Sequence, residues 1–360
     1  MSNRLLSQID ISLFLPVVVL VSFSLTTLFS MDIDFFKNQL FYILVSFTVF
    51  IFFSHSNIKI FQYYSLLLYI ASIVLLILVL VLGAETRGAV RWIDIFGLRI
   101  QFSEVLKPFL ALSLAGFIGR TERRDLRFLL LVFFFSLPVG VLIFLQPDLG
   151  NAIIYFGVLF ATLIAVGFPK RWFLAGFIIL VLASPILWHF LHDYQKQRVL
   201  TFINPMQDPL GTSYNAVQSI VAVGSGMVIG KGLGEGTQSG LRFLPERHTD
   251  FIFASLSEVF GFIGTAIVVI TFGFILYRIY ALFNHVDDRA SRVFVAVSFF
   301  LILVQSFVNI SMNIGILPVV GVTLPFVSFG GSSILSNFII LGMLSSLKTR
   351  EKLQQVLEIK

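Results

Sequence analysis

The stretch 243–258, FLPERHTDFIFASLSE, concentrates residue types that transfer protons and hold anions. Its polar part ends where an apolar run begins, so a helix is expected to start there. In a helix that starts at Asp250, the carboxylates of Asp250 and Glu258 share one face, about two turns apart. A carboxylate that is desolvated on one side has the raised basicity of a general base. We predict Asp250 as the base and Arg247, His248 and Glu258 as binding residues; alternatively, Thr249 or Asp250 simply caps the helix.

A second constellation is the stretch 87–107, RGAVRWIDIFGLRIQFSEVLK. Three arginines precede Glu104 and Lys107, which are three residues apart and therefore adjacent on a helix. One interpretation is a buried ion pair that holds this helix to its neighbours. The other is that these cations bind an anionic group of a ligand. The two interpretations are compatible.

Two shorter motifs carry further polar groups. In LQPDLGN (145–151), Asp148 follows a proline, so it either caps the next helix or contacts a ligand. In GVTLPFVSFGGSS (321–333), Ser332 and its neighbours offer hydroxyl groups without charge. The structural alternative for this second motif is a loop whose small residues allow helices to pack closely.

The composition requires a membrane. Of 360 residues, 57% are hydrophobic and 12% are charged, and the mean hydropathy is +0.95. A soluble domain carries about 25% charged residues. Because lipid offers the backbone no hydrogen-bond partner, apolar runs of this length must be helices, and we predict an all-α polytopic membrane protein. The chain has no cysteine, which excludes disulfides and thiolate metal ligands, and its net charge of +6 needs no nucleic-acid partner.

We expect about ten transmembrane helices in a single domain over residues 1–360. The predicted spans are 12–30, 35–54, 60–83, 103–119, 127–145, 149–167, 171–189, 251–278, 291–316 and 330–347. One long loop, about 190–250, separates the seventh and eighth helices. Its segment 216–223 is apolar enough to return toward the membrane.

The distribution of Lys and Arg predicts the orientation, because positive charge is retained in cytoplasmic loops. With both termini inside, fifteen basic residues are cytoplasmic, namely Arg4, Lys59, Arg120, Arg123, Arg124, Arg127, Lys170, Arg171, Arg278, Arg289, Arg292, Lys348, Arg350, Lys352 and Lys360. Outside the long loop, the opposite side holds five: Lys37, Arg87, Arg91, Arg99 and Lys107. The long loop and Asp250 are therefore expected on the extracytoplasmic side.

Several motifs together resemble the SEDS family of shape, elongation, division and sporulation proteins. They are RWIDIFGLRIQFSEVLK, QPDLG (146–150), INPMQDPLGTSYNAVQS (203–219), GTQSGLRF (236–243), FLPERHTDFIFA and LPFVSFGGSS, in the family's order along nearly the whole chain. The KQRVLTF run (196–202) and ERHTD favour the elongation members (RodA) over the division members (FtsW). The chain departs from the usual pattern at Phe102, Asn204, Met227, Val259 and Phe329, none of which is a proposed catalytic group.

The resemblance implies a peptidoglycan glycosyltransferase of the bacterial inner membrane. Such an enzyme polymerises lipid II, a disaccharide-pentapeptide on undecaprenyl pyrophosphate, at the outer face, beside a class B penicillin-binding protein and the elongation machinery. The family's essential acidic residue falls on Asp250, and its ion pair falls on Glu104 and Lys107. The departing pyrophosphate needs positive charge, for which Arg198, Lys107, Arg247 or a bound divalent cation such as Mg²⁺ or Mn²⁺ are the candidates.

Two other classes of function remain at this point. A lipid flippase or proton-coupled transporter needs ionisable residues along a path through the bundle, and the centres of the first, second, third, fifth and seventh predicted helices offer almost none. A non-catalytic scaffold would leave the outer carboxylates and cations without a role. Polar groups gathered toward one face fit an enzyme better than either.

Single cysteines test the predicted orientation without background, because the native chain has none. Positions for labelling from outside are Asp208→Cys, Glu235→Cys and Glu246→Cys, and the matched inner positions are Glu122→Cys, Lys170→Cys and Asp288→Cys. We expect a membrane-impermeant thiol reagent to label the first group in intact spheroplasts and the second group after the membrane is opened. The reverse pattern would overturn the orientation. Cysteines in the cytoplasmic halves of the fourth, eighth and ninth predicted helices that the reagent labels from both sides of the membrane would instead support transport.

Overall fold

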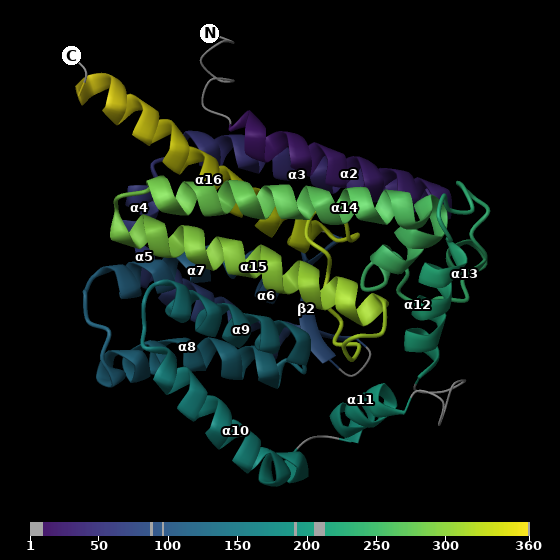
Figure 1. The fold of residues 1–360 in the computed structure, drawn as a ribbon, viewed down its shortest axis with the longest axis horizontal. Helices are drawn as coiled ribbons and strands as arrows, with labels where there is room; N and C mark the ends of the chain where they lie inside the picture. Colours follow the sequence, from purple (N-terminus) through teal and green to yellow (C-terminus); the bar gives the residue numbers. More distant parts are fainter. Residues whose placement is uncertain (1–9, 87–88, 96, 191–192, 205–212, 359–360) are drawn as a thin grey trace.

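The computed structural model describes residues 10–86, 89–95, 97–190, 193–204 and 213–358. Its long helices lie side by side in one bundle, except that the helix over Lys170–Phe190 runs obliquely away from the others (Figure 1). They are α2 (Ile11–Met31), α3 (Ile33–His55), α5 (Ser65–Leu82), α7 (Lys107–Gly119), α8 (Leu126–Leu145), α9 (Leu149–Ala165), α10 (Lys170–Phe190), α14 (Ile252–His285), α15 (Arg289–Asn313) and α16 (Gly331–Glu358). The shorter helices are α4 (Ile58–Tyr63), α6 (Phe102–Val105), α11 (Asp193–Ile203), α12 (Tyr214–Ser225) and α13 (Thr237–Gly240).

Each of the ten predicted spans overlaps one of the long helices. Six of the described helices are long and apolar enough to cross a membrane: α2, α3, α5, α8, α14 and α15. Helices α7 and α9 and the first part of α16, Gly331–Leu347, are apolar but shorter. The chain is an all-α, multi-pass membrane protein, which confirms the predicted fold class.

Some boundaries differ from the prediction for local reasons. The fourth span is interrupted at Leu106, between α6 and α7, and Pro108 lies in the first turn of α7, where its missing N–H costs no helical bond. Helix α14 extends to His285 rather than to residue 278. Helix α15 ends at Asn313, before Gly315, whose φ of 80° is left-handed.

A small sheet in the loop after α5 was not predicted. Strands β1 (Ala84–Thr86), β2 (Ala89–Ile95) and β3 (Leu98–Gln101) form an antiparallel meander in the order β1-β2-β3. Ile95 pairs with Leu98, and Gly97 between them has a φ of 81°, which suits a tight hairpin. The sheet leads directly into α6 and so fixes the start of the segment that carries Glu104.

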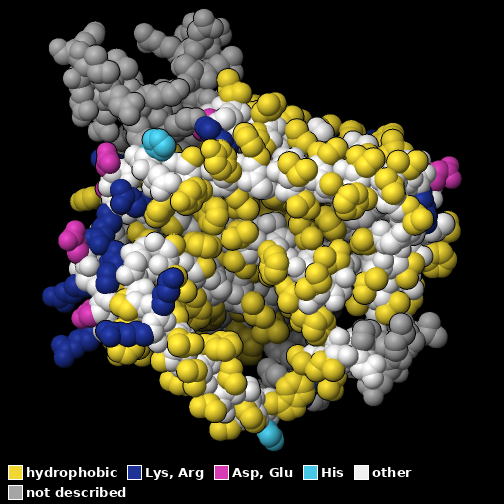
Figure 2. All heavy atoms as spheres, viewed as in Figure 1, with side chains coloured by type: hydrophobic (Ala, Val, Ile, Leu, Met, Phe, Trp, Pro, Cys, Tyr) yellow, Lys and Arg dark blue, Asp and Glu magenta, His cyan; other side chains and the backbone are white. Residues whose placement is uncertain are grey.

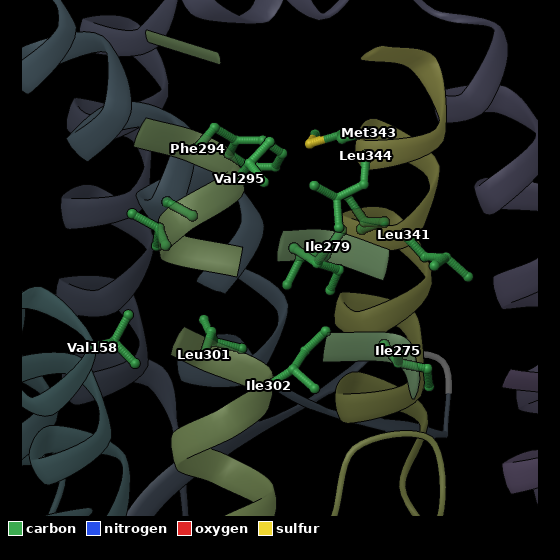
Figure 3. Packing of buried hydrophobic residues seen from close by; sticks show 14 of the residues in the cluster. Val158, Ile275, Ile279, Phe294, Val295, Leu301, Ile302, Leu341, Met343 and Leu344 are labelled. Carbon is green, nitrogen blue, oxygen red and sulfur yellow. The ribbon is translucent and has the colours of Figure 1, made fainter. Parts of the chain in front are cut away.

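The core lies where α14, α15 and α16 meet. Ile275 and Ile279 of α14, Ile302 of α15 and Leu344 of α16 are all buried in the same apolar cluster (Figure 3). Apolar surface buried between helices gains no hydrophobic free energy over lipid, so close packing supplies the stabilisation. On the face seen in Figure 2, most Lys and Arg side chains gather at one end of this bundle, the end where α16 finishes (Figures 1 and 2). That gathering agrees with the positive-inside pattern, and the orientation stays a prediction.

The crossing of α16 and α3 tests this dependence on close packing. A Cβ at Gly342 of α16 would lie 2.8 Å from the carbonyl oxygen of Phe50 and 2.9 Å from Cβ of Phe53. We therefore expect Gly342→Ala to lower the free energy of unfolding by about 1–3 kcal/mol, the usual cost of overpacking. Gly273 of α14 is the control, because a Cβ there meets nothing within 4 Å and Ala is the better helix former. Thermal unfolding in detergent measures both; equal melting temperatures would contradict the prediction.

Candidate functional site

Asp250 lies in a turn immediately before α14, not inside the helix. The N-cap position is Phe251, so the alternative in which Thr249 or Asp250 caps the helix is wrong. The turn is closed by backbone bonds from the N–H groups of Thr249 and Phe251 to the carbonyl of Glu246, at 3.1 and 3.2 Å. The Asp250 side chain is half-buried. This residue therefore presents its carboxylate at the rim of the bundle.

Two asparagines of α15 hold the backbone of Asp250. The Nδ2 atoms of Asn309 and Asn313 each donate to the Asp250 carbonyl oxygen at 3.0 Å. Both asparagines are buried, and Asn309 also donates to the carbonyl of Val322 at 2.6 Å. The sequence analysis did not identify them. Their signal is a pair of amides four residues apart, hence on one face of a predicted membrane helix, where polar side chains are expensive.

The segment 321–330 lies against the same turn. A Cβ at Gly321 would be 3.3 Å from Oδ2 of Asp250, so this segment approaches the carboxylate closely. Ser328 donates its hydroxyl to the Thr249 carbonyl at 2.7 Å, and Phe329 donates its N–H to the His248 carbonyl at 2.9 Å. The carboxylate and this segment are thus fixed relative to each other.

Arg247 and His248 flank the turn in different ways. The His248 ring stacks on Phe35, with ring centroids 4.3 Å apart and planes 9° from parallel. Arg247 is 6% exposed, and its Nε finds no hydrogen-bond partner among the described residues. Burial lowers the pKa of Arg247, the nearby Arg242 lowers it further, and Asp32 acts in the opposite direction. The sequence prediction of a cation beside Asp250 therefore corresponds to a buried guanidinium three residues away.

Glu258 is buried within α14 and is fully engaged. It accepts from Lys231 Nζ at 3.0 Å, from the backbone N–H groups of Gln238 and Ser239 at 2.9 and 2.8 Å, and from the Ser239 hydroxyl at 2.7 Å. A ligand would have to displace these donors. The expected contact between Glu258 and a ligand stays a prediction that this geometry does not favour; the residue positions the 231–239 segment.

Glu104 and Lys107 form the predicted ion pair. Lys107 Nζ lies 2.7 Å from Glu104 Oε1, and both side chains are buried. The second carboxylate oxygen, Oε2, finds no hydrogen-bond partner among the described residues. Lys107 also lines a cavity of about 50 Å³, together with Tyr69, Ser136 and Tyr155. A buried pair with spare hydrogen-bonding capacity is compatible with either of the predicted roles.

Asp148 and Ser332 meet at Gln101, the last residue of β3. Asp148 caps α9 by accepting from the Asn151 N–H at 3.3 Å, which confirms the capping alternative. It also accepts from Nε2 of Gln101 at 2.9 Å, while the backbone N–H of Gln101 donates to the Ser332 hydroxyl at 2.9 Å. Both predicted binding residues therefore hold the sheet to the bundle.

The segment 321–333 connects these two groups of residues. Thr323 accepts from Nε2 of Gln305 at 3.0 Å and lies 2.9 Å from the hydroxyl of Ser333, next to Ser332. Its start contacts Asp250 and its end contacts Gln101. The structure thus links the constellations that were predicted separately from the sequence.

Some predicted residues are not placed by these contacts. Arg87 and Asp208 lie outside the described residues, and so does the side chain of Arg198 in α11. In the described part of the chain, no three His, Asp or Glu residues come together as ligands for a metal ion. The described residues therefore do not form a preorganised divalent-cation site.

The family model and the curated relatives that match this chain point to the same family of proteins. A model of the FtsW/RodA/SpoVE family, described as cell cycle protein, matches residues 3–353. The peptidoglycan glycosyltransferase MrdB of Escherichia coli strain K12 is 36% identical over 358 residues, covering 96% of this chain and 95% of that protein.

Two solved structures have the same fold. A chain of a peptidoglycan synthase complex that coordinates polymerization and crosslinking gives a TM-score of 0.84 at 29% identity, covering 95% of this chain and 98% of that one. The rod shape determining protein RodA of Thermus thermophilus gives a TM-score of 0.70 at 28% identity, covering 95% and 97%. Together with the family match, these similarities confirm the resemblance seen in the sequence motifs: the chain belongs to the FtsW/RodA/SpoVE family of cell cycle proteins.

Proposed function

We propose that Asp250 is the general base of this chain, a peptidoglycan glycosyltransferase of the elongation type in the bacterial inner membrane. The observation that carries the proposal is the placement of its carboxylate. It is half-buried at the rim of the bundle, in a turn whose carbonyl is held by two buried asparagines. A base must be held in place and yet reachable by the acceptor hydroxyl.

The substrate we propose is lipid II, at the extracytoplasmic face. The Asp250 carboxylate takes the proton of the acceptor sugar's hydroxyl, whose oxygen attacks the anomeric carbon of the donor. The bond from that carbon to the pyrophosphate oxygen breaks, and the lipid pyrophosphate leaves with the electron pair. A single displacement of this kind inverts the anomeric centre from the α-linked pyrophosphate to a β-linked glycan. Because pyrophosphate is a good leaving group, a second carboxylate acting as general acid is not required.

Arg247 is the residue we assign to the leaving pyrophosphate. Its guanidinium is buried three residues from Asp250, with Nε unpartnered among the described residues. Although burial lowers the pKa of the Arg247 guanidinium, an arginine keeps its charge at neutral pH. Lys107 is the second candidate, but its ammonium group is already paired with the Glu104 carboxylate, with Nζ 2.7 Å from Oε1. Arg198 stays a prediction from the sequence.

The partner we propose is a class B penicillin-binding protein that cross-links the glycan strands, within the elongation machinery. In support, this chain aligns along 98% of a chain from a complex that coordinates polymerization and crosslinking. Membrane lipid is the solvent for the remaining outer surface.

Asp250→Asn keeps the size of the side chain and removes the base. We expect glycan polymer from lipid II to fall by at least about 100-fold, the usual contribution of a general base. Thermal stability should hold, because Asn309 and Asn313 bind the backbone carbonyl rather than the carboxylate. Purified protein with its transpeptidase and lipid II, scored on a gel, measures this. Glu235→Gln, at an exposed loop carboxylate, is the control and should polymerise like wild type. A folded Asp250→Asn protein with near wild-type polymerisation would refute the assignment.

The ion pair allows its structural and binding roles to be separated. Lys107→Ala and Glu104→Ala each leave one buried charge unpaired, so each should cost about 3–5 kcal/mol of unfolding free energy. The double variant should be no less stable than either single variant, because the two residues form one unit. If Lys107 also contacts the pyrophosphate, Lys107→Ala lowers polymerisation further than Glu104→Ala does at matched stability. Turnover that falls only in proportion to stability in all three variants would argue for a purely structural pair.

A further inference from the structure

Helix α14 is broken at Gly261, and another part of the chain repairs the break. Gly261 has φ 66° and ψ −163°, which no helix contains. The N–H groups of Phe262 and Ile263 donate to the carbonyls of Met227 and Val228, at 2.9 and 3.1 Å. The segment 226–232 therefore supplies acceptors that the preceding turn of the helix does not.

The same segment also satisfies the carbonyls above the break. The N–H groups of Lys231 and Gly232 donate to the carbonyls of Glu258 and Val259, at 2.9 and 3.1 Å. Glycines permit this approach of two backbones. A Cβ at Gly226 would lie 1.9 Å from the Ser257 carbonyl oxygen, and a Cβ at Gly230 would lie 2.1 Å from that of Val259. The backbone hydrogen bonds between the 226–232 segment and α14 thus lie on both sides of the break. A residue larger than glycine at position 226 or 230 would prevent this approach.

Three consecutive apolar side chains at the start of this segment point away from the protein. Met227 is 77% exposed, Val228 is 61% exposed and Ile229 is 78% exposed; we call these three residues the tip. On α14, the neighbouring side chains of Phe262 and Ile263 are exposed as well. The tip and this face of α14 form one continuous apolar surface, while the backbone beneath is hydrogen-bonded. Lipid tolerates non-helical backbone under that condition.

The depth of the break in the membrane can be located by comparison with α2, which packs on α14. Phe260, one residue before the break, contacts Phe23 with ring centroids 5.0 Å apart. Helix α2 continues for eight residues beyond Phe23, to Met31, which corresponds to about 12 Å of rise. With its 21 residues, α2 is about as long as the hydrocarbon layer is thick. The break and the tip paired with it therefore lie within the length of α2, not beyond its end.

We infer that residues 226–232 form a re-entrant segment whose tip is inserted among the acyl chains of the leaflet on the Asp250 side. The occupant of the apolar surface is lipid hydrocarbon, because the surface lies at membrane depth and is continuous with the lipid-facing side of α14. Immediately after the tip, Lys231 returns to polar partners, 3.0 Å from Glu258 and 2.9 Å from Thr237. Through Glu258, the inserted segment is attached to the 236–239 loop that leads toward the Asp250 turn. This inference does not depend on the role assigned to Asp250.

The absence of native cysteine makes the test direct. Met227→Cys and Ile229→Cys carry a nitroxide in proteoliposomes of phosphatidylethanolamine and phosphatidylglycerol, with Glu235→Cys on the same loop as the control. We expect the accessibility ratio of dissolved oxygen to a water-soluble nickel chelate to exceed one at the tip and to fall below one at position 235. A ratio below one at the tip would place it in water, and low accessibility to both reagents would mean that protein covers it. Either result would overturn the inference.

A second measurement uses the unmodified chain and so does not depend on the cysteine variants. The full-length protein is reconstituted with a phospholipid that carries a photoreactive diazirine in its acyl chain, and labelled peptides are mapped by mass spectrometry. We expect label on the peptide that contains Met227 to Ile229. Label on the lipid-facing part of α14 around Phe262, without label on the tip, would contradict insertion.

Discussion

Every backbone polar group inside a membrane must find a partner within the protein, and the architecture of this chain depends on that constraint. Long helices meet it automatically. Where the backbone leaves the helix, the structure supplies a specific substitute. At Gly261 the substitute is the 226–232 segment, and at Asp250 it is the pair of amides from Asn309 and Asn313. The non-helical places are also where the polar chemistry lies.

The site follows from the same constraint. Had α14 begun three residues earlier, Asp250 would lie within its first turn, and its carbonyl would be bound by the helix itself. Instead the turn precedes the helix, and α15 and the 321–330 segment hold it from two sides. The buried asparagines are expensive in an apolar helix, and their cost is offset by fixing the one turn that carries the half-buried carboxylate. Rigidity around a reachable side chain is what a catalytic base requires.

The separation along the chain between interacting residues determined which features the sequence could predict. Apolar runs of sufficient length identify membrane helices by themselves, and Asp148 and the Glu104–Lys107 pair act within three residues, so these features were predictable. The acceptor of Asn313 lies 63 residues away, and Ser332 binds a backbone N–H 231 residues away. No local pattern reports such partners. The sheet was missed because its strands are short, and the break at Gly261 because its repair comes from a distant loop.

Burial separates the four acidic residues that the sequence analysis proposed for the site. Glu104, Asp148 and Glu258 are buried, and each fixes other groups: Lys107, the start of α9, and the 231–239 segment. Asp148 and Glu258 each accept several hydrogen bonds, and Glu104 is paired with Lys107, so protonating any of these carboxylates would disturb the groups that it holds. Asp250 differs in being half-buried, with its backbone rather than its carboxylate bearing the asparagine contacts. The division is therefore physical: three buried carboxylates hold other parts of the chain in place, and the partly exposed one is the carboxylate that we propose as the base.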